Sequence, residues 1–202
     1  MRVKYDIIIM NKEGLNLSKD TKEQIFLNAR SAFSQFGYKH TSLEQIARMS
    51  GTGKSTIYHY VSSKRSLFKQ IISEEIEHNE RLVDEFLSSD PKIEEISNFL
   101  HYYRENHLNS VLIDKIIHES KQIGTTEAFE ELARLEENNH LLMRRILEHF
   151  NVKKDDEDLS ILAFLIVEIY NLLSIKWAET NKPLNKEKTN DIISTFIKTN
   201  LK

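Results

Sequence analysis

Glycine and proline are scarce in this chain, whose 202 residues include only 5 Gly and 2 Pro. These two residues most often interrupt helices, so long helices can run here with few breaks. Apolar side chains recur at helical spacing along most of the sequence, and the alternation typical of a half-buried strand is seen only weakly, between Val3 and Ile9. With 40% hydrophobic residues, the chain can also bury a sizeable core. We therefore expect an all-α protein of about nine helices.

Local signals predict where these helices begin and end. The first should start at Asp20 or Thr21 and end at Gly37. The second should be capped by Thr41 or Ser42, and the fourth by Ser62 or Ser63. The dipeptide Asp90-Pro91 predicts a helix start, with Asp90 as the N-cap and Pro91 at the first helical position. The helices are expected over residues 20–36, 42–50, 54–60, 63–87, 91–103, 108–121, 127–150, 155–178 and 186–199.

The composition also bounds the setting in which the protein works. Cysteine is absent, so the chain forms no disulfide, and a reducing cytoplasm is the simplest expectation. The apolar run at residues 7–10 is too short for a signal peptide. Residues 161–175 are the most apolar stretch, but Glu168, Asn171 and Ser174 interrupt it and it is shorter than a membrane span. We expect a soluble, cytoplasmic protein with no membrane partner.

Charge is distributed unevenly along the chain. Residues 19–75 contain nine Lys or Arg and five Asp or Glu. Residues 76–202 contain 16 Lys or Arg and 24 Asp or Glu. A basic front joined to an acidic body is typical of a protein that presents one end to a polyanion, although chance clustering on solvated helix faces would give the same numbers.

Residues 41–69 carry the pattern with the clearest functional meaning. Two short helices are joined by a turn at Gly51, and the second, from Lys54 to Tyr60, carries cationic, hydroxyl and aromatic side chains. That is the layout of a helix-turn-helix, which places one helix in the DNA major groove. We expect DNA contacts from the recognition helix, from the start of the helix before it and from the start of the helix after it. The candidates are Thr41, Ser42, Thr52, Gly53, Lys54, Ser55, Thr56, Tyr58, His59, Lys64 and Arg65.

The same segment resembles the TetR/AcrR family of bacterial transcriptional regulators. The features that carry the resemblance are Phe36-Gly37-Tyr38, Thr41-Ser42, Ile46-Ala47, Gly51, Tyr58-His59-Tyr60-Val61, Lys64 and Leu67-Phe68. The resemblance implies an arm at 1–18, a DNA-binding domain at 19–79 with its helix-turn-helix at 42–61, and a helical ligand-binding and dimerisation domain at 80–202. The chain departs from the family at Thr52, at Gly53, where a capping Ser or Thr is usual, and at Val61.

A fourth departure is the pair of cations at the start of the next helix. The family commonly has acids after Lys64, but this chain has Arg65 and Ser66. A cation at a helix N-terminus costs about 0.3–1 kcal/mol, which a bound phosphate would reverse. Arg65 is therefore predicted to contact the DNA backbone.

A phosphate-binding loop is the rival interpretation of Gly51 to Thr56. The ending Gly-Lys-Ser-Thr fits the motif, but its first glycine would have to stand at position 48, which is Arg48. The motif must also follow a strand, and a helix is expected there. We expect no enzyme, no cofactor and, since histidines such as His118 and His140 have no obvious partners, no metal site.

The C-terminal two-thirds of the chain predicts how the DNA-reading helix is positioned and controlled. One helix-turn-helix reads few bases, so a homodimer on double-stranded operator DNA is expected, formed by the two C-terminal helices because 159–177 is apolar nearly all round. The resemblance implies a pocket for a small-molecule effector and a repressor released by it. Candidate pocket residues are Phe99, Tyr102, Tyr103, His107, Phe129, Leu142, Met143, Phe164 and Trp177. The alternative function is a helical adaptor whose basic face binds an acidic partner other than DNA.

Overall fold

The computed structural model describes residues 17–105, 110–123, 126–150, 152, 155–179 and 186–200, and every regular element in them is a helix. The helices are α1 (Leu17–Phe36), α2 (Leu43–Met49), α3 (Lys54–Tyr60), α4 (Lys64–Ser88), the 3-10 turn η1 (Ile93–Glu95), α5 (Ile96–Glu105), α6 (Ser110–Ile123), α7 (Thr126–His149), α8 (Asp156–Glu179) and α9 (Lys186–Asn200). The predicted all-α fold is confirmed, while the weak strand pattern between Val3 and Ile9 lies outside the described residues. None of the described helices is both long and apolar enough to cross a lipid bilayer.

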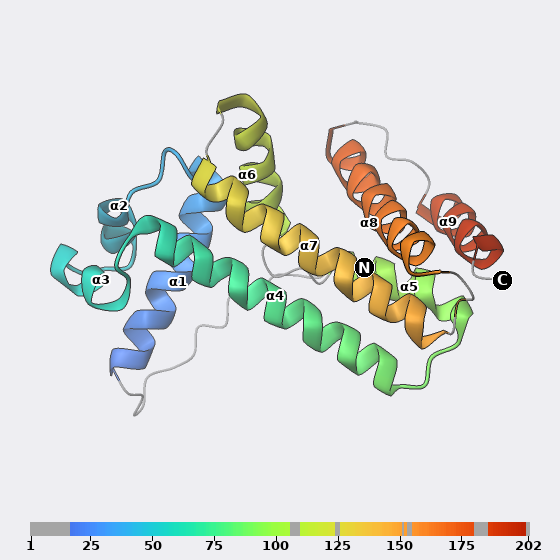
Figure 1. Cartoon of the computed structure of the whole chain (residues 1–202). Coiled ribbons are helices and arrows are strands. Elements are labelled where there is room, and N and C mark those ends of the chain that lie inside the picture. Colours follow the sequence, from blue (N-terminus) through green and yellow to red (C-terminus); the bar gives the residue numbers. More distant parts are fainter. Residues whose placement is uncertain are drawn as a thin grey trace.

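Two long helices, α4 and α7, lie side by side and connect the two ends of the molecule (Figure 1). They run in the same direction, because Arg65 near the start of α4 pairs with Glu130, and Asp84 near its end pairs with Arg145. Helices α1, α2 and α3 form a head at one end, and α8 packs along α7 at the other, with α5 and α9 beside each other (Figure 1).

The core consists of two clusters of buried side chains. The first joins the head to the body, since it contains Phe33 and Phe68 from α1 and α4 together with Ile116 from α6 and Ala128 from α7. The second fills the space between the end of α4 and helices α5, α7, α8 and α9. The head is therefore packed directly against α6 and the start of α7, and α4 runs unbroken across the predicted domain boundary at residue 79.

Several predicted helix ends are confirmed. Ser42 caps α2 by accepting a hydrogen bond from the Gln45 backbone N–H. Ser63 caps α4 in a reciprocal pair, in which its hydroxyl accepts from the Ser66 N–H and the Ser66 hydroxyl accepts from the Ser63 N–H. Gly37 ends α1 at a φ of +82°, a conformation that side chains with a Cβ rarely adopt.

Two predicted helix starts are wrong. Helix α1 begins at Leu17, so Asp20 and Thr21 lie within it, because no glycine or proline between Leu17 and Phe36 interrupts the helix. Asp90 has a φ of +54°, whereas an N-cap needs an extended backbone. Lys92 has that backbone and precedes η1, and its N–H donates to the Glu95 carboxylate.

Candidate nucleic-acid interface

Helix α3 is held against the head by its apolar side. Ile57 is fully buried in the first core cluster, together with Ile46 of α2 and Val61 just after α3. Tyr60 packs partly against the same cluster. Because residues about four apart share a helix face, this attachment turns the remaining side chains of α3 outward.

The outward side of α3 is polar and aromatic. Lys54, Ser55, Tyr58 and His59 are exposed, and Thr56 is half-buried. Lys54 pairs with Glu44 of α2 at 2.8 Å, and this hydrogen bond raises the pKa of the lysine and lowers that of the glutamate. Tyr58, at 46% exposure, is a large aromatic side chain with a polar end, and the Lys54 ammonium lies 5.9 Å from the centre of its ring. This face offers the donors, acceptors and apolar surface that base-edge recognition requires.

The turn before α3 is built from Gly51, Thr52 and Gly53. Gly51 has a φ of +65°. The Thr52 hydroxyl donates to the Ala47 carbonyl at 3.3 Å, so it stabilises the turn. Gly53 is exposed and provides no side-chain cap for α3, as the missing Ser or Thr predicts.

The segment that fits the end of a phosphate-binding loop has the wrong surroundings for that role. Lys54, Ser55 and Thr56 form the first turn of α3, and the preceding element is helix α2. The strand that such a loop must follow is absent from this part of the structure.

At the start of α2, two neighbouring hydroxyl residues have different positions. Ser42 is exposed beside the first N–H groups of the helix. Thr41 is only 3% exposed, and its hydroxyl donates to the carbonyls of Gly37 and Ala32 at 2.7 and 3.3 Å. The expectation that the Thr41 side chain faces DNA is therefore wrong, since its hydroxyl is used inside the head.

Lys64 is also directed into the head rather than out from it. Its ammonium donates to the carbonyls of Tyr38 and Thr41 at 2.9 and 3.0 Å and lies 4.4 Å from the centre of the Tyr38 ring. Burial lowers the pKa of Lys64, although the carboxylates of Glu127 and Glu119 oppose that shift. Its charge stabilises the turn between α1 and α2, so the side chain as placed is not available to a phosphate.

Arg65 has a partner that its place in the sequence does not suggest. Its guanidinium pairs with Glu130 of α7 at 2.5 Å, and both side chains are at least half exposed. A carboxylate from the body therefore already pairs with this cation. The contact with the DNA backbone stays a prediction.

Glu119 of α6 is the residue at this end that sequence reasoning missed. It is 6% exposed, and its carboxylate accepts hydrogen bonds from the backbone N–H groups of Tyr38 at 2.5 Å and Lys39 at 2.6 Å. The Tyr38 hydroxyl donates to Glu127 of α7 at 2.6 Å, and burial and this bond raise the pKa of Tyr38. A carboxylate at helical spacing from the buried Leu112 and Ile116 was the available signal. These contacts fix the head relative to α6 and α7.

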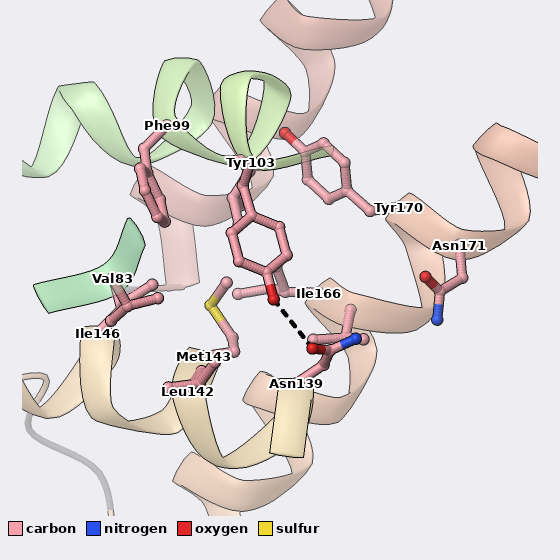
Figure 2. Close-up of a pocket in the computed structure, with 12 residues that line it drawn as sticks. Val83, Phe99, Tyr103, Asn139, Leu142, Met143, Ile146, Ile166, Tyr170 and Asn171 are labelled. Atoms are coloured by element: carbon pink, nitrogen blue, oxygen red, sulfur yellow. Dashed lines mark hydrogen bonds between the residues drawn. The ribbon is translucent and has the colours of Figure 1, made fainter. Parts of the chain in front are cut away.

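A cavity of about 60 Å³ lies in the second half of the molecule, between α4, α5, α7 and α8 (Figure 2). It is lined by Val83, Phe99, Leu100, Tyr103, Asn139, Leu142, Met143, Ile146, Ile166, Val167, Tyr170 and Asn171. Four of these, Phe99, Tyr103, Leu142 and Met143, are among the pocket residues predicted from the sequence.

The other predicted pocket residues do not line this cavity. The exposed fractions of Tyr102, Phe129 and Phe164 are 53%, 61% and 49%. Helical spacing alone does not indicate which side of each helix faces the cavity, so these aromatic residues were wrongly predicted to line it. His107 lies outside the described residues, and Trp177 lies in α8 with a side chain whose position is not described.

His140 does have partners, contrary to expectation. Its Nε2 lies 3.3 Å from Glu168 Oε1, and Glu136 is close enough for ligand atoms of all three to fall within 4.8 Å of one another. Burial and the charge of Glu168 raise the pKa of Glu136. Such groups of exposed acids are common without a bound ion, and the pairing of His140 with Glu168 is sufficient to explain the arrangement.

Helices α2 and α3 are joined by the tight turn at Gly51, and α3 exposes its polar side at the end of the molecule. These features define a helix-turn-helix protein. Comparison with known proteins agrees. Residues 22–71 match the model of the bacterial regulatory proteins of the tetR family. An HTH-type transcriptional regulator of Bacillus subtilis, YhgD, is 28% identical over 191 residues, which are 90% of this chain and 96% of that protein. RutR of Escherichia coli K12, also an HTH-type transcriptional regulator, is 39% identical over 51 residues, about a quarter of each chain.

The likeness extends to the fold of the whole chain. A TetR-family transcriptional regulator from Syntrophomonas wolfei superposes with a TM-score of 0.72 at 21% identity, over 91% of this chain and 95% of that one. Residues 22–71 are thus similar to the bacterial regulatory proteins of the tetR family, the described chain has the fold of such a regulator, and the protein is a DNA-binding transcriptional regulator.

Proposed function

We propose that this regulator is a repressor that binds its operator as a homodimer in the cytoplasm and leaves it when a small molecule fills the cavity in the body. The observation that carries the proposal is the path of α4. This helix begins in the head, where Lys64 holds the turn between α1 and α2, and it contributes Val83 to the cavity wall. One rigid helix therefore touches both the DNA-reading end and the cavity.

On DNA, α3 would lie in the major groove. Tyr58, Thr56 and Ser55 would meet base edges, and Lys54 and His59 would meet bases or phosphates. Ser42, at the start of α2, would receive a phosphate, where free N–H groups favour an anion. Gly53 allows close approach of the backbone.

The proposed dimer forms through α8 and α9. One side of α8 is buried against α7, as Leu162 and Ile166 show, but its other side leaves large apolar residues in solvent. These are Ile161, Phe164, Leu165 and Leu172, and Ile192 of α9 is 70% exposed. Exposed apolar surface on this scale marks protein contacts, and a second copy would place two recognition helices on half-sites about 34–36 Å apart.

Release would follow from a shift between two arrangements of the heads. A ligand that fits better when α4 has moved favours that arrangement, and the spacing of the two recognition helices then no longer matches the operator.

A gel shift with the DNA upstream of its own gene, over a series of salt concentrations, tests the DNA-binding part of the proposal. A sequence-specific regulator should show both a steep salt dependence and a preference for this DNA over an unrelated duplex. A steep salt dependence without any preference would instead support a general polyanion binder, such as the helical adaptor.

Arg65→Gln is expected to weaken binding to all DNA sequences alike. It should make the slope of log K against log salt shallower by about 1.8 for the dimer, because each copy loses one phosphate contact worth about 0.9. Glu130→Gln is the matched control, because it removes the partner of Arg65 and keeps the cation. It should strengthen binding or leave it unchanged. If both variants behave as the unmodified protein does, Arg65 makes no contact with the DNA backbone.

A further inference from the structure

The chemistry of the cavity limits what can fill it. Among the residues that the structure describes, its lining contains no charged side chain, and most of its surface is aliphatic or aromatic, from residues such as Val83, Phe99 and Ile166. Four lining residues carry polar groups: Tyr103 on α5, Asn139 on α7, and Tyr170 and Asn171 on α8. Asn171 is exposed and so belongs to the outer part of the cavity. A ligand here is surrounded mainly by apolar atoms and meets few hydrogen-bonding groups.

Asn139 is held in one orientation by two donors. The Tyr103 hydroxyl donates to its Oδ1 at 2.9 Å, and the amide of the fully buried Asn79 donates to the same oxygen at 3.2 Å. Turning the Asn139 amide over would set its N–H groups against those of Asn79. Both lone pairs of the oxygen are thus used. Figure 2 shows the amide nitrogen of Asn139 on the side away from Tyr103. The group that Asn139 presents to a ligand is therefore an N–H donor.

The described lining of the cavity offers a charged ligand no partner of opposite charge. Glu75, fully buried on α4 one turn before Asn79, acts on Tyr103, whose pKa is raised by burial and by the charge of this glutamate. A ligand carboxylate would enter the same negative field with no cation among the described lining residues to pair with it. An ammonium group would be favoured by that field, but it would face the N–H of Asn139, whose oxygen already accepts two hydrogen bonds, and the described lining residues offer it no carboxylate.

The cavity is so small that a ligand can fill it only if the surrounding helices move. At about 60 Å³ it is smaller than the cavity of about 150 Å³ that accepts benzene in a protein core. A six-membered ring can enter only if the walls separate, and Met143, with its flexible unbranched side chain, allows this more easily than the packed rings. Because Val83 belongs to α4, separation of the walls would displace the helix that leads to the head.

We propose that the effector is an uncharged, mostly apolar small molecule with one hydrogen-bond acceptor, such as a ketone or quinone carbonyl, which the N–H of Asn139 receives. This assignment rests on the proposed function, since it names the ligand of the same cavity.

The test uses the full chain and four probes with one six-membered ring: cyclohexanone, methylcyclohexane, cyclohexanecarboxylate and cyclohexylammonium. Isothermal titration without DNA should give the tightest binding for the ketone, by roughly 3–10-fold over the hydrocarbon, the range expected for one net hydrogen bond. The two ions should bind more weakly than the hydrocarbon. Equal or tighter binding of the carboxylate or the ammonium would overturn the assignment.

Asn139→Leu should abolish the preference for cyclohexanone over methylcyclohexane, while methylcyclohexane should still bind. Asn138→Leu is the matched control on the same helix, because the Asn138 amide bonds Glu80 and does not line the cavity. It should keep the full preference. Tyr103→Phe, which removes one of the two donors that orient Asn139, should reduce the preference and provides a second variant if Asn139→Leu does not fold. An unchanged preference in both Asn139→Leu and Tyr103→Phe would contradict the role of Asn139.

A gel shift with cyclohexanone separates this assignment from the proposed function. Release of the DNA by the ketone, but not by the carboxylate, supports both. If the ketone binds as expected and the DNA complex persists, the proposed release is wrong and the ligand assignment stands. If the protein binds its operator but none of the four probes, the ligand assignment is wrong and DNA binding stands.

Discussion

Replacing Gly37 with alanine is expected to lower the free energy of unfolding by roughly 3–5 kcal/mol, the sum of a strained backbone and damaged charge-assisted hydrogen bonds. Gly37 has a φ of +82°, where a Cβ alone costs about 1–2 kcal/mol. The added Cβ would also clash with the Glu119 carboxylate, coming within 3.0 Å of Cδ and closer still to Oε2. Glu119 would have to withdraw from the backbone N–H groups of Tyr38 and Lys39. Thermal unfolding should show a melting temperature lower by roughly 10 °C.

Gly51→Ala is the matched control for this prediction. Gly51 also has a positive φ, of +65°, but no atom lies within 4 Å of where its Cβ would be. Only the backbone strain of about 1–2 kcal/mol should remain. Equal losses in the two variants would show that Glu119 does not restrict position 37.

A double-mutant cycle can isolate the contact itself. Glu119→Ala alone should be destabilising because it leaves the N–H groups of Tyr38 and Lys39 without their acceptor. Once that carboxylate is gone, Gly37→Ala no longer causes a clash. The combined loss should therefore fall short of the sum by about 1–2 kcal/mol, and strict additivity would contradict the proposed contact.

Some features of the structure could be predicted from the sequence and others could not. The difference depends on how far apart along the chain the interacting residues lie. The caps at Ser42 and Ser63 and the turns at Gly37 and Gly51 depend on residues at most five positions apart, so they could be predicted locally. The outward face of α3 was also predictable, because one buried residue, Ile57, fixes the orientation of a seven-residue helix.

The contacts between head and body could not be predicted in this way. Glu119 lies about 80 residues from the backbone it holds, and Glu130 lies 65 residues from Arg65. Finding them requires the relative rotation of α4, α6 and α7, which depends on packing of the whole core. The same reason explains the cavity: helical spacing from Leu142 and Ile146 puts Asn139 on the inward side of its own helix, but the residues of α4, α5 and α8 that face it depend on how the helices pack.

The exposed apolar side of α8 leads to the second large effect. Leu165→Glu is expected to raise the dissociation constant of the dimer by roughly 100-fold or more, because a buried, unpaired carboxylate costs several kcal/mol and each 1.4 kcal/mol changes the constant tenfold. Leu165 is 42% exposed in a single chain, so the fold itself should tolerate the charge. Sedimentation equilibrium over a dilution series should show the variant dissociating at concentrations roughly 100-fold higher than the unmodified protein does.

Leu27→Glu provides the control for this substitution. Leu27 is 59% exposed on α1, at the opposite end of the molecule. A charge at this position should therefore leave the dimer intact. If Leu165→Glu stays dimeric, α8 does not form the interface. If it becomes monomeric, its operator affinity should also fall by roughly 100-fold, since a monomer reads only one half-site. Because a single recognition helix contacts few bases, a second copy held through α8 would contribute much of the specificity. The pair of variants therefore tests whether DNA recognition depends on the apolar side of α8 as well as on the polar side of α3.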